Sequence, residues 1–345
     1  MSSDPNKNGK KIISLIYYSF SSFVRQDYQN LSKHFHVRKV NYRRLNDALD
    51  IAKAVHESDV SFSWFAGGHA FLAVLFSKIL GKKSIIVVGG YDVACVPEID
   101  YGLFTQAWQK RLMTKLALKH ADKVLVVDPS LTEDAIRNAK ITGNNFEYLP
   151  TGHDYEMFYP QGTKKNIALT VCMCEDCSRA KIKGVDTFVK TAKNLPDIKF
   201  LAIGLGGDAL EKLQKIAPSN AELMGPVSQD DLISLYQEAK VYCQLSIREG
   251  LPSALCEAML CECIPVVTER NGMPRAIGDT GFFVPVSDPD SAAKAIAKAL
   301  QQPEEIGRRA RERIMEQFPM ERRERGLVRA IDEVTEGGKI RRNDN

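Results

Sequence analysis

Short runs of β-branched and apolar residues alternate with amphipathic helical stretches along almost the whole 345-residue chain. Such alternation is typical of parallel β-sheets whose crossover helices cover both faces. It therefore predicts an α/β fold, and the length of the chain favours two cores over one. The expected strands are residues 12–18, 37–41, 60–65, 84–89, 123–128, 146–150, 167–173, 199–203, 241–245, 264–268 and 281–284.

The alternation breaks once, at residues 158–165, where FYPQGTKK places proline, glycine and two lysines together. Proline and glycine are the strongest local breaks in regular structure. We therefore expect a Rossmann-like N-terminal domain over residues 1–160 and a second one over residues 161–318. The remaining chain contains only helical patterns, so residues 319–336 are expected to form a helix that returns to the first domain, followed by a flexible tail at 337–345.

The composition excludes several classes of protein. Hydrophobic residues make up 44% of the chain and charged residues 26%, as in soluble globular proteins. The net charge of +4 is too small for a dedicated nucleic-acid binder, and it suits an anionic small ligand or an anionic membrane surface. The N-terminus is polar, and no stretch reaches the roughly eighteen apolar residues of a membrane span. We expect a cytoplasmic protein, with a peripheral position at the inner membrane face as the alternative.

Eight cysteines occur without a secretory signal, so we expect reduced thiols rather than a disulfide framework. Three of them, Cys172, Cys174 and Cys177, lie close together in the sequence. No neighbouring histidine or further cysteine completes a four-ligand set. We therefore interpret this cluster as strand and loop thiols, with no metal.

The most informative segment is LSIREGLPSALCEAM at residues 245–259, where a strand ends and Pro252 suits the first turn of a helix. Its backbone N–H groups could bind phosphate oxygens. Glu249 and Glu257 accept hydrogen bonds only, so each could hold sugar hydroxyls, although two solvated charges are the alternative. A glutamate such as Glu257 inside an apolar helix is costly without a partner. The candidate phosphate donors are the N–H groups of Gly250, Leu251, Ser253 and Ala254.

Two further loops each follow a predicted strand. The first, IGLGGD at residues 203–208, contains Gly204 and Gly206 and opens a helix, as a phosphate site or a tight turn without a ligand would. The second, SRAKIKG at residues 178–184, carries three cations at the carboxyl end of a strand, where open α/β sheets bind ligands. Arg179, Lys181 and Lys183 there would neutralise a diphosphate, unless the loop is simply a solvated basic one.

Together with these motifs, the second half of the chain resembles a family 4 retaining glycosyltransferase of the GT-B fold, one of the glycosyl transferases group 1. The resemblance implies two Rossmann-like domains that face each other across a cleft. It also implies a nucleotide-diphosphate-sugar donor, a glycan, lipid-linked or small-molecule acceptor, and no metal, cofactor or nucleic acid. The motifs that carry it are YLPTGHDYEMFYP (148–160), KGVDTF (183–188), FLAIGLGG (200–207), MGPVSQDDLISLY (224–236), the two glutamates with seven residues between them, and IPVVTERNG (264–272).

The resemblance also implies roles for individual residues. Glu257 would hold the ribose hydroxyls of the donor, and Glu249 would lie beside the transferred sugar. Lys183 would contact the diphosphate with an upstream arginine, which is Arg179, or with Lys181 because the spacing differs from the family's. The base would be bordered by main-chain atoms of Gly225, Pro226 and Val227, and the helix-end amides would come from Gly250 to Ala254.

The first domain gives fewer candidates. A histidine that the family often directs at the donor sugar is missing at residues 90–92, and we select Asp92 as the candidate catalytic residue there. His69 is a second candidate, although a histidine at a helix start has an ordinary structural explanation. In the helical stretch that follows, Trp108, Leu112 and Leu116 form a stripe. This stripe either lies on an anionic membrane or packs inward; the basic residues beside it are Lys110, Arg111, Lys115 and Lys119.

Other functions remain as alternatives. A sugar-nucleotide epimerase or a phosphorylase could share the fold, but the ordered donor motifs argue against both. A nicotinamide oxidoreductase would need a G-x-G-x-x-G turn after its opening strand, and residues 15–20 contain no glycine. A diverged protein that binds sugar nucleotides without catalysis is the non-enzymatic alternative.

Overall fold

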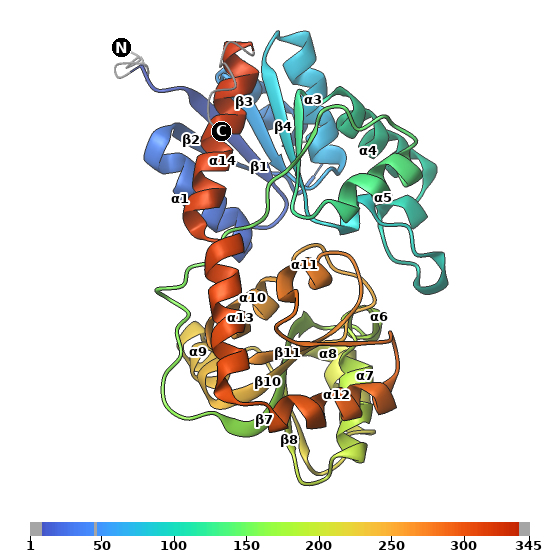
Figure 1. Ribbon diagram of the computed structural model, residues 1–345. Coiled ribbons are helices and arrows are strands. Elements are labelled where there is room, and N and C mark those ends of the chain that lie inside the picture. The colour runs from blue at the N-terminus through green and yellow to red at the C-terminus, as the bar shows by residue number, and fades with distance from the viewer. Residues whose placement is uncertain (1–8, 45–46, 338–345) are drawn as a thin grey trace. The chain divides into compact units, whose positions relative to one another are not determined.

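The computed structural model describes residues 9–44 and 47–337. Residues 338–345 of the expected C-terminal tail lie outside these residues. The chain divides into two compact units, one formed by residues 1–151 and 321–345 and the other by residues 152–320 (Figure 1). Each unit contains a six-stranded, entirely parallel β-sheet, which confirms the predicted α/β class.

Unit 1 has the strand order β2-β1-β3-β4-β5-β6. Its strands are β1 (Ile12–Tyr17), β2 (His36–Asn41), β3 (Val60–Trp64), β4 (Lys83–Val88), β5 (Lys123–Val126) and β6 (Phe146–Tyr148). Its helices are α1 (Ser22–His34), α2 (Ala48–His56), α3 (Gly68–Ile79), α4 (Trp108–His120), α5 (Ser130–Ala139) and α14 (Met320–Glu336), with short 3-10 turns at Tyr91–Val93, Pro97–Ile99 and Leu103–Thr105.

Unit 2 has the strand order β12-β11-β10-β7-β8-β9. Its strands are β7 (Lys165–Cys174), β8 (Lys199–Leu205), β9 (Ala221–Met224), β10 (Ala239–Gln244), β11 (Ile264–Thr268) and β12 (Phe282–Val284). Its helices are α6 (Cys177–Ile182), α7 (Val185–Thr191), α8 (Gly207–Gln214), α9 (Gln229–Glu238), α10 (Ser253–Leu260), α11 (Met273–Ile277), α12 (Pro289–Gln301) and α13 (Glu304–Gln317), with a 3-10 turn at Ala192–Asn194.

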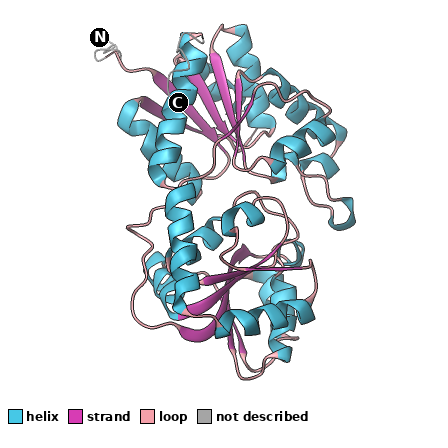
Figure 2. Ribbon diagram, in the orientation of Figure 1, coloured by secondary structure: helices cyan, strands magenta, loops and turns pink. Residues whose placement is uncertain are grey.

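Helices cover both faces of each sheet (Figure 2). The central strands are consequently apolar on both faces, as parallel sheets require. In unit 1, Ile13, Leu15 and Ile16 of β1 are fully buried, and in unit 2 Val241 and Cys243 of β10 are fully buried. Burial on both faces explains why these strands appear in the sequence as continuous apolar runs rather than as an alternating pattern.

The chain enters unit 2 at Gly152, ahead of the expected boundary at residue 160. The reason is that the segment after β6 is bound by α13 and its end. The Arg311 guanidinium donates to the carbonyl oxygens of Phe158 at 2.8 Å and Tyr155 at 3.1 Å, and His153 N donates to Phe318 O at 2.9 Å. These backbone contacts hold the segment to unit 2.

Helix α14 is anchored to unit 1 by a buried ion pair. Arg323 Nε and Nη2 donate to the two carboxylate oxygens of Asp27, at 2.9 and 2.6 Å, and Nη1 donates to Leu149 O at 2.8 Å. Trp64 Nε1 also donates to Asp27, at 2.9 Å. Both charged side chains are inaccessible to solvent, so their stability depends on these hydrogen bonds inside the unit.

Candidate active site

The strand order of unit 2 determines where a ligand can bind. Strands β7 and β10 are neighbours in the sheet, and the chain leaves them in opposite directions, toward β8 and toward β11. Open α/β sheets bind ligands at the carboxyl ends of the strands on either side of such a switch point. The loop after β7 carries the three predicted cations, and the loop after β10 leads to Glu249.

These two loops are packed directly against each other. Gly184 has a φ of +71°, and a Cβ there would lie 2.0 Å from Leu245 O, so only glycine is tolerated at this position. Ile247 N also donates to Ile182 O at 2.7 Å. The backbone contact therefore brings Lys183 beside the loop that follows β10.

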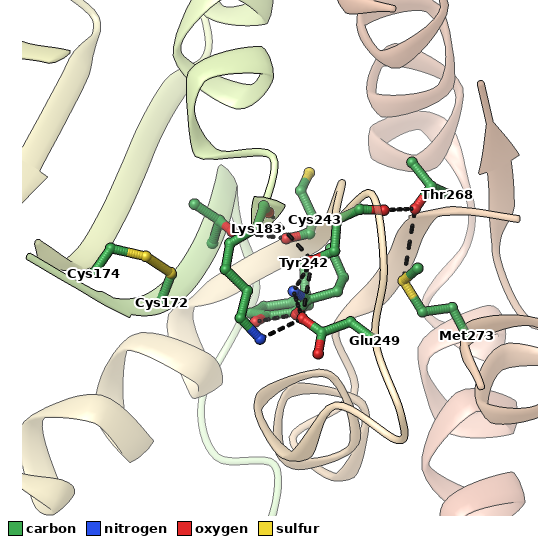
Figure 3. Close-up of polar contacts among 11 residues, drawn as sticks. Cys172, Cys174, Lys183, Tyr242, Cys243, Glu249, Thr268 and Met273 are labelled. Atoms are coloured by element: carbon green, nitrogen blue, oxygen red, sulfur yellow. Dashed lines mark hydrogen bonds and ion pairs between the residues drawn. A yellow bond between two sulfur atoms is a disulfide. The ribbon is translucent and has the colours of Figure 1, made fainter. Parts of the chain in front are cut away.

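Lys183 and Glu249 form the centre of the site. Lys183 Nζ lies 2.5 Å from Glu249 Oε1, and the two side chains point toward one another (Figure 3). The Glu249 side chain retains only 10% of its exposure, whereas Lys183 retains 28%. Two residues that the sequence analysis did not select, Ser246 and Gln244, contact the same oxygen, Oε1, at 3.0 and 3.3 Å.

Helix α10 begins directly after this loop. Pro252 is its N-cap residue, and no side chain caps the helix. Among the residues that the structure describes, none accepts a hydrogen bond from the backbone N–H groups at this end of the helix, which belong to Gly250, Leu251, Ser253 and Ala254. Uncapped N–H groups and the positive end of the helix dipole favour an anion.

Glu257 lies one turn further along α10 and is largely buried. Burial raises its pKa from 4.5 to about 7, although a hydrogen bond from Tyr236 opposes the shift. Tyr236 Oη donates to Glu257 Oε2 at 3.3 Å. Tyr236, from α9, is the partner that a buried glutamate in an apolar helix requires. The sequence motif at 224–236 includes this tyrosine but did not relate it to Glu257.

The glycine-rich turn after β8 is shaped by the strands next to it in the sheet, β7 and β9. Gly204 has a φ of +91°, and a Cβ there would lie 2.7 Å from Cys172 O. Gly204 N donates to Gly225 O at 3.2 Å and Gly206 N donates to Cys174 O at 2.9 Å. The turn therefore places Gly225, which Pro226 and Val227 follow, beside the carboxyl ends of β7 and β8, while Gly206 N-caps α8 without any side-chain contribution.

Arg179 and Lys181 both lie on α6 and are exposed. The helix is capped by Asp176, whose side chain accepts a hydrogen bond from Arg179 N at 2.8 Å. The basic segment predicted as a loop is thus mostly helical. Its two exposed cations remain candidates for a diphosphate, and the choice between them stays a prediction.

In unit 1 both candidate residues are buried and contact the backbone of the same unit. The Nδ1 atom of His69 has no hydrogen-bond partner among the described residues. Asp92 is buried, and its carboxylate accepts from Ala66 N at 3.0 Å and from Gly90 N at 2.9 Å. Burial raises the pKa of Asp92 in spite of these donors. His69 is buried on α3 with Nε2 2.7 Å from Trp64 O, and burial lowers its pKa to about 4. Asp92 thereby connects the loop after β3 to the loop after β4, whereas His69 contacts only the end of β3. A catalytic role for Asp92 stays a prediction.

The expectation of reduced thiols is wrong at two positions, because Cys172 and Cys174 form a disulfide (Figure 3). Residues two apart in a strand project from the same face, and the register of β7 against β8 shifts between Val171 and Cys174. Their Cα atoms lie 5.6 Å apart, within the usual range for a disulfide. The free cysteines are Cys95, Cys177, Cys243, Cys256, Cys261 and Cys263.

Two negative findings hold for residues 9–44 and 47–337. No group of three or more His, Cys, Asp or Glu side chains there could hold a metal ion. No helix in the same residues combines the length and the apolarity needed to cross a bilayer.

Comparison with known proteins relates this geometry to other chains. Residues 176–317 match the family described as glycosyl transferases group 1. The chain is 30% identical over 285 residues to N-acetyl-α-D-glucosaminyl L-malate synthase of Bacillus anthracis, an alignment that covers 76% of this chain and 72% of that enzyme. It is 23% identical over 247 residues to a phosphatidylinositol N-acetylglucosaminyltransferase chain of Arabidopsis thaliana, covering 68% of this chain but only 53% of the relative's length.

The fold is similar to that of solved structures with very different sequences. The crystal structure of Anabaena HepE in complex with UDP and glucose superposes with a TM-score of 0.78 at 12% identity, covering 94% of this chain and all of that one. Sucrose-phosphate synthase from Thermosynechococcus elongatus superposes with a TM-score of 0.74 at 16% identity, covering 95% of this chain and all of that one.

Proposed function

The chain belongs to the group 1 glycosyltransferases, and we propose that it transfers a sugar from a nucleotide-diphosphate sugar to an acceptor with retention of anomeric configuration. Unit 2 binds the donor and unit 1 binds the acceptor. The observation that carries the proposal is the pairing of Lys183 with Glu249 at the switch point of the second sheet, next to the uncapped N-terminus of α10. A cation, a carboxylate and free amides at one position are the groups that a diphosphate joined to a sugar requires.

In this proposal the main contribution of the protein to catalysis is electrostatic. When the bond between the sugar and the diphosphate breaks, negative charge develops on the leaving phosphate. Lys183, the α10 amides and one of the exposed cations Arg179 and Lys181 stabilise that charge. A preorganised site contributes most where charge develops during the reaction. Glu249 holds a hydroxyl of the transferred sugar, and no protein nucleophile is assigned.

Glu257 binds the ribose of the donor in the same proposal. A carboxylate accepts hydrogen bonds only, so two adjacent ribose hydroxyls are its natural partners. Glycines 204 and 206, together with the main chain of Gly225, Pro226 and Val227, border the nucleotide. The support for this placement is that these loops all follow neighbouring strands β7, β8, β9 and β10 of one sheet edge.

Helix α4 supports a lipid-linked acceptor at an anionic membrane surface. Trp108 is 62% exposed and Leu112 44% exposed, so these two do not pack inward; the buried residues of the helix are instead Thr114, Ala117 and Leu118. The helix contains no acidic residue, and its four Lys and Arg residues flank the two apolar ones. Exposed aromatic and apolar side chains beside cations are typical of helices that lie on anionic lipid.

Nucleotide binding is the first test of the proposal. Thermal unfolding is measured with UDP, GDP, ADP and a sugar nucleotide of each base. A ligand at a hundred times its dissociation constant stabilises the folded protein by roughly 2.7 kcal/mol. Absence of a shift with every one of them would remove the proposed function, and binding without transfer or donor hydrolysis would indicate the non-catalytic alternative. The anomeric configuration of the product, read by NMR, decides whether transfer occurs with retention.

Membrane contact is tested separately by sedimentation with vesicles. Vesicles that contain phosphatidylglycerol should bind the protein, and pure phosphatidylcholine vesicles should not. The double variant W108A/L112A should lose most of that binding, whereas L49A, which removes an exposed leucine from α2, should keep it. Equal binding by all variants would exclude α4 as the contact surface.

A further inference from the structure

A row of buried polar side chains runs along β10 toward Glu249. Tyr242 is fully buried, Gln244 is 3% exposed, and Ser246, just after the strand, is fully buried. Residues two apart on a strand share one face, so these three side chains lie in line. Burying an amide and two hydroxyls at the end of a parallel strand is costly unless each finds a partner. The partners show what the row does.

The amide of Gln244 is oriented from both sides. Tyr242 Oη donates to Gln244 Oε1 at 3.0 Å, and Gln244 Nε2 lies 2.8 Å from Ser246 Oγ and 3.3 Å from Glu249 Oε1. A carboxylate can only accept, so the NH2 group must face Glu249 and the amide oxygen must face the tyrosine. Reversing the amide would place its oxygen against the carboxylate and its NH2 against the tyrosine.

The three side chains that donate to Glu249 all contact the same oxygen, Oε1. Oε1 accepts from Lys183 Nζ at 2.5 Å, from Ser246 Oγ at 3.0 Å and from Gln244 Nε2 at 3.3 Å. Among residues 9–44 and 47–337, no side chain or backbone group donates to Oε2. One oxygen is therefore held by the protein, and the other remains able to accept a hydrogen bond from a ligand.

We propose that Gln244 is a positioning residue for the glycosyl transfer: oriented by Tyr242, it holds Glu249 through Oε1 so that Oε2 accepts one hydroxyl of the donor sugar. This inference rests on the proposed function and goes beyond it, because it assigns a task to a residue that does not touch the donor. A diphosphate competes with Glu249 for the Lys183 ammonium. Gln244 and Ser246 are neutral and are not attracted to the phosphate, so their hydrogen bonds to Glu249 persist when the Lys183 ammonium contacts the phosphate.

The backbone under this row is fixed as well. Thr268, at the end of β11, donates from Oγ1 to the carbonyl oxygen of Ser246 (Figure 3). Ser246 Oγ also lies 3.3 Å from Lys183 O, on the neighbouring loop. The backbone of Ser246 is thus hydrogen-bonded to β11, and Ser246 itself contacts the loop that carries Lys183. Binding sites supported by such contacts hold their groups more precisely than sites on unsupported loops.

The test compares Q244M, Y242F and the control T170V. Thr170, in the adjacent strand β7, is equally buried and donates to Cys243 O at 2.9 Å, but it does not contact Glu249. Each variant is titrated with UDP and UDP-glucose, GDP and GDP-mannose, or ADP and ADP-glucose, using the pair that stabilises the wild type. Turnover is then measured with the same donor.

We expect Q244M to lower kcat by roughly ten- to a hundredfold, because it removes a hydrogen bond to a charged group. Affinity for the bare nucleoside diphosphate should stay within twofold, while the preference for the sugar nucleotide over it should shrink. Y242F, which removes only the group that orients the amide, should show a smaller loss of the same kind. T170V should lower the melting temperature without either change.

A third variant, Q244E, gives a readout that a purely structural role would not produce. It places a second carboxylate beside Glu249, and like charges this close raise the pKa of one of them. Its activity should therefore fall toward high pH, relative to the wild type, and recover in part toward low pH. The wild type and T170V should not show this shift.

The outcomes separate the two proposals. If the wild type neither binds nor turns over any sugar nucleotide, the proposed function fails. If the wild type is active and Q244M keeps its kcat, or loses nucleotide affinity as much as kcat, the role of Gln244 is wrong. If Q244M does not fold, the role of Gln244 is tested with Y242F and Q244E instead. An unchanged pH profile in Q244E together with an unchanged kcat in Y242F would then overturn that role.

Discussion

The two units contain the same kind of parallel sheet but use their buried charged groups in opposite ways. In unit 1, the Asp27 carboxylate accepts from Arg323 and Trp64, and the Asp92 carboxylate accepts from two backbone N–H groups. In unit 2, the described residues contact one oxygen of Glu249, and Glu257 accepts from a single phenol among them, Tyr236, at 3.3 Å. Saturated groups stabilise a fold, whereas groups with remaining hydrogen-bonding capacity can bind a ligand.

The two sheets also differ in the side chains at the carboxyl ends of their strands. The loops after β1 and β3 of unit 1 bring Tyr18 and His69 together, with ring centroids 4.1 Å apart. The loops after β7 and β10 of unit 2 bring together Lys183, Glu249 and the open end of α10. Similar topology therefore carries an aromatic pair at one edge and a cation, a carboxylate and an uncapped helix end at the other, so the two edges differ in their side chains rather than in the kind of sheet.

The largest effect is expected in unit 1. R323M should lower the free energy of unfolding by about 3–5 kcal/mol, because it leaves the Asp27 charge buried without its partner. Denaturant unfolding measures this loss, and R325M, an exposed position on the same helix, is the control. Nucleotide affinity of the folded fraction should not change. A fall in that affinity would mean that the two units are not energetically separate.

K183M should reduce turnover strongly and stability little, the reverse of what is expected for R323M. We expect turnover to drop by about 10²- to 10³-fold, the usual loss when one group that stabilises transition-state charge is removed. Stability should change little, because the lysine is partly exposed and Glu249 keeps its neutral partners. K190M, on the exposed side of α7, serves as the control. A loss of stability as large as that of R323M would show that the Lys183–Glu249 pair is structural.

The pH dependence of E257Q sharpens the comparison. The pKa of Glu257 is about 7 in the folded protein against an ordinary 4.5, so between these values the folded chain retains a proton that the unfolded chain has released. The free energy of unfolding of the wild type should therefore fall, relative to E257Q, as pH rises from 4.5 to 7, by up to roughly 3 kcal/mol. Urea unfolding at pH 5 and pH 8 measures the difference.

Nucleotide affinity should rise with pH, whereas the free energy of unfolding of the wild type should fall. Ribose hydroxyls donate to the ionised carboxylate, so the affinity of the wild type should rise as pH passes through 7, while E257Q should bind weakly throughout. Calorimetric titration across this range tests the expectation. A parallel pH dependence in both proteins would exclude Glu257 as the titrating group.

The smallest effects are expected at the exposed cations of α6. R179A and K181A should each weaken nucleoside diphosphate binding by at most about two- to fivefold, because exposed charge pairs contribute about 0.2–1 kcal/mol. The larger loss identifies the residue that contacts the diphosphate. K193A, an exposed lysine outside the site, should have no effect. Unchanged binding in both R179A and K181A would assign the diphosphate to Lys183 and the α10 amides alone.

Much of the fold was predictable because its signals are local. Each of the eleven predicted strands overlaps a strand of the structure, and most contain the run of apolar residues that a strand buried on both faces requires. The strand at Ala221–Met224 was missed, since none of its four residues is fully buried and the segment resembles a loop. The disulfide was missed because composition and the absence of a secretory signal say nothing about two cysteines that face the same side of one strand.

Local sequence signals were sufficient to predict the two sheets, the glycine-rich turn after β8 and the spacing of Glu249 and Glu257 on either side of a helix start. That Lys183, 66 residues before Glu249 in the chain, lies beside it and that Gln244 contacts the same oxygen became clear from the folded arrangement alone. The physical reason is that periodicity and turn chemistry act within a few residues. The adjacency of β7 and β10 instead depends on the pairing and packing of the whole sheet.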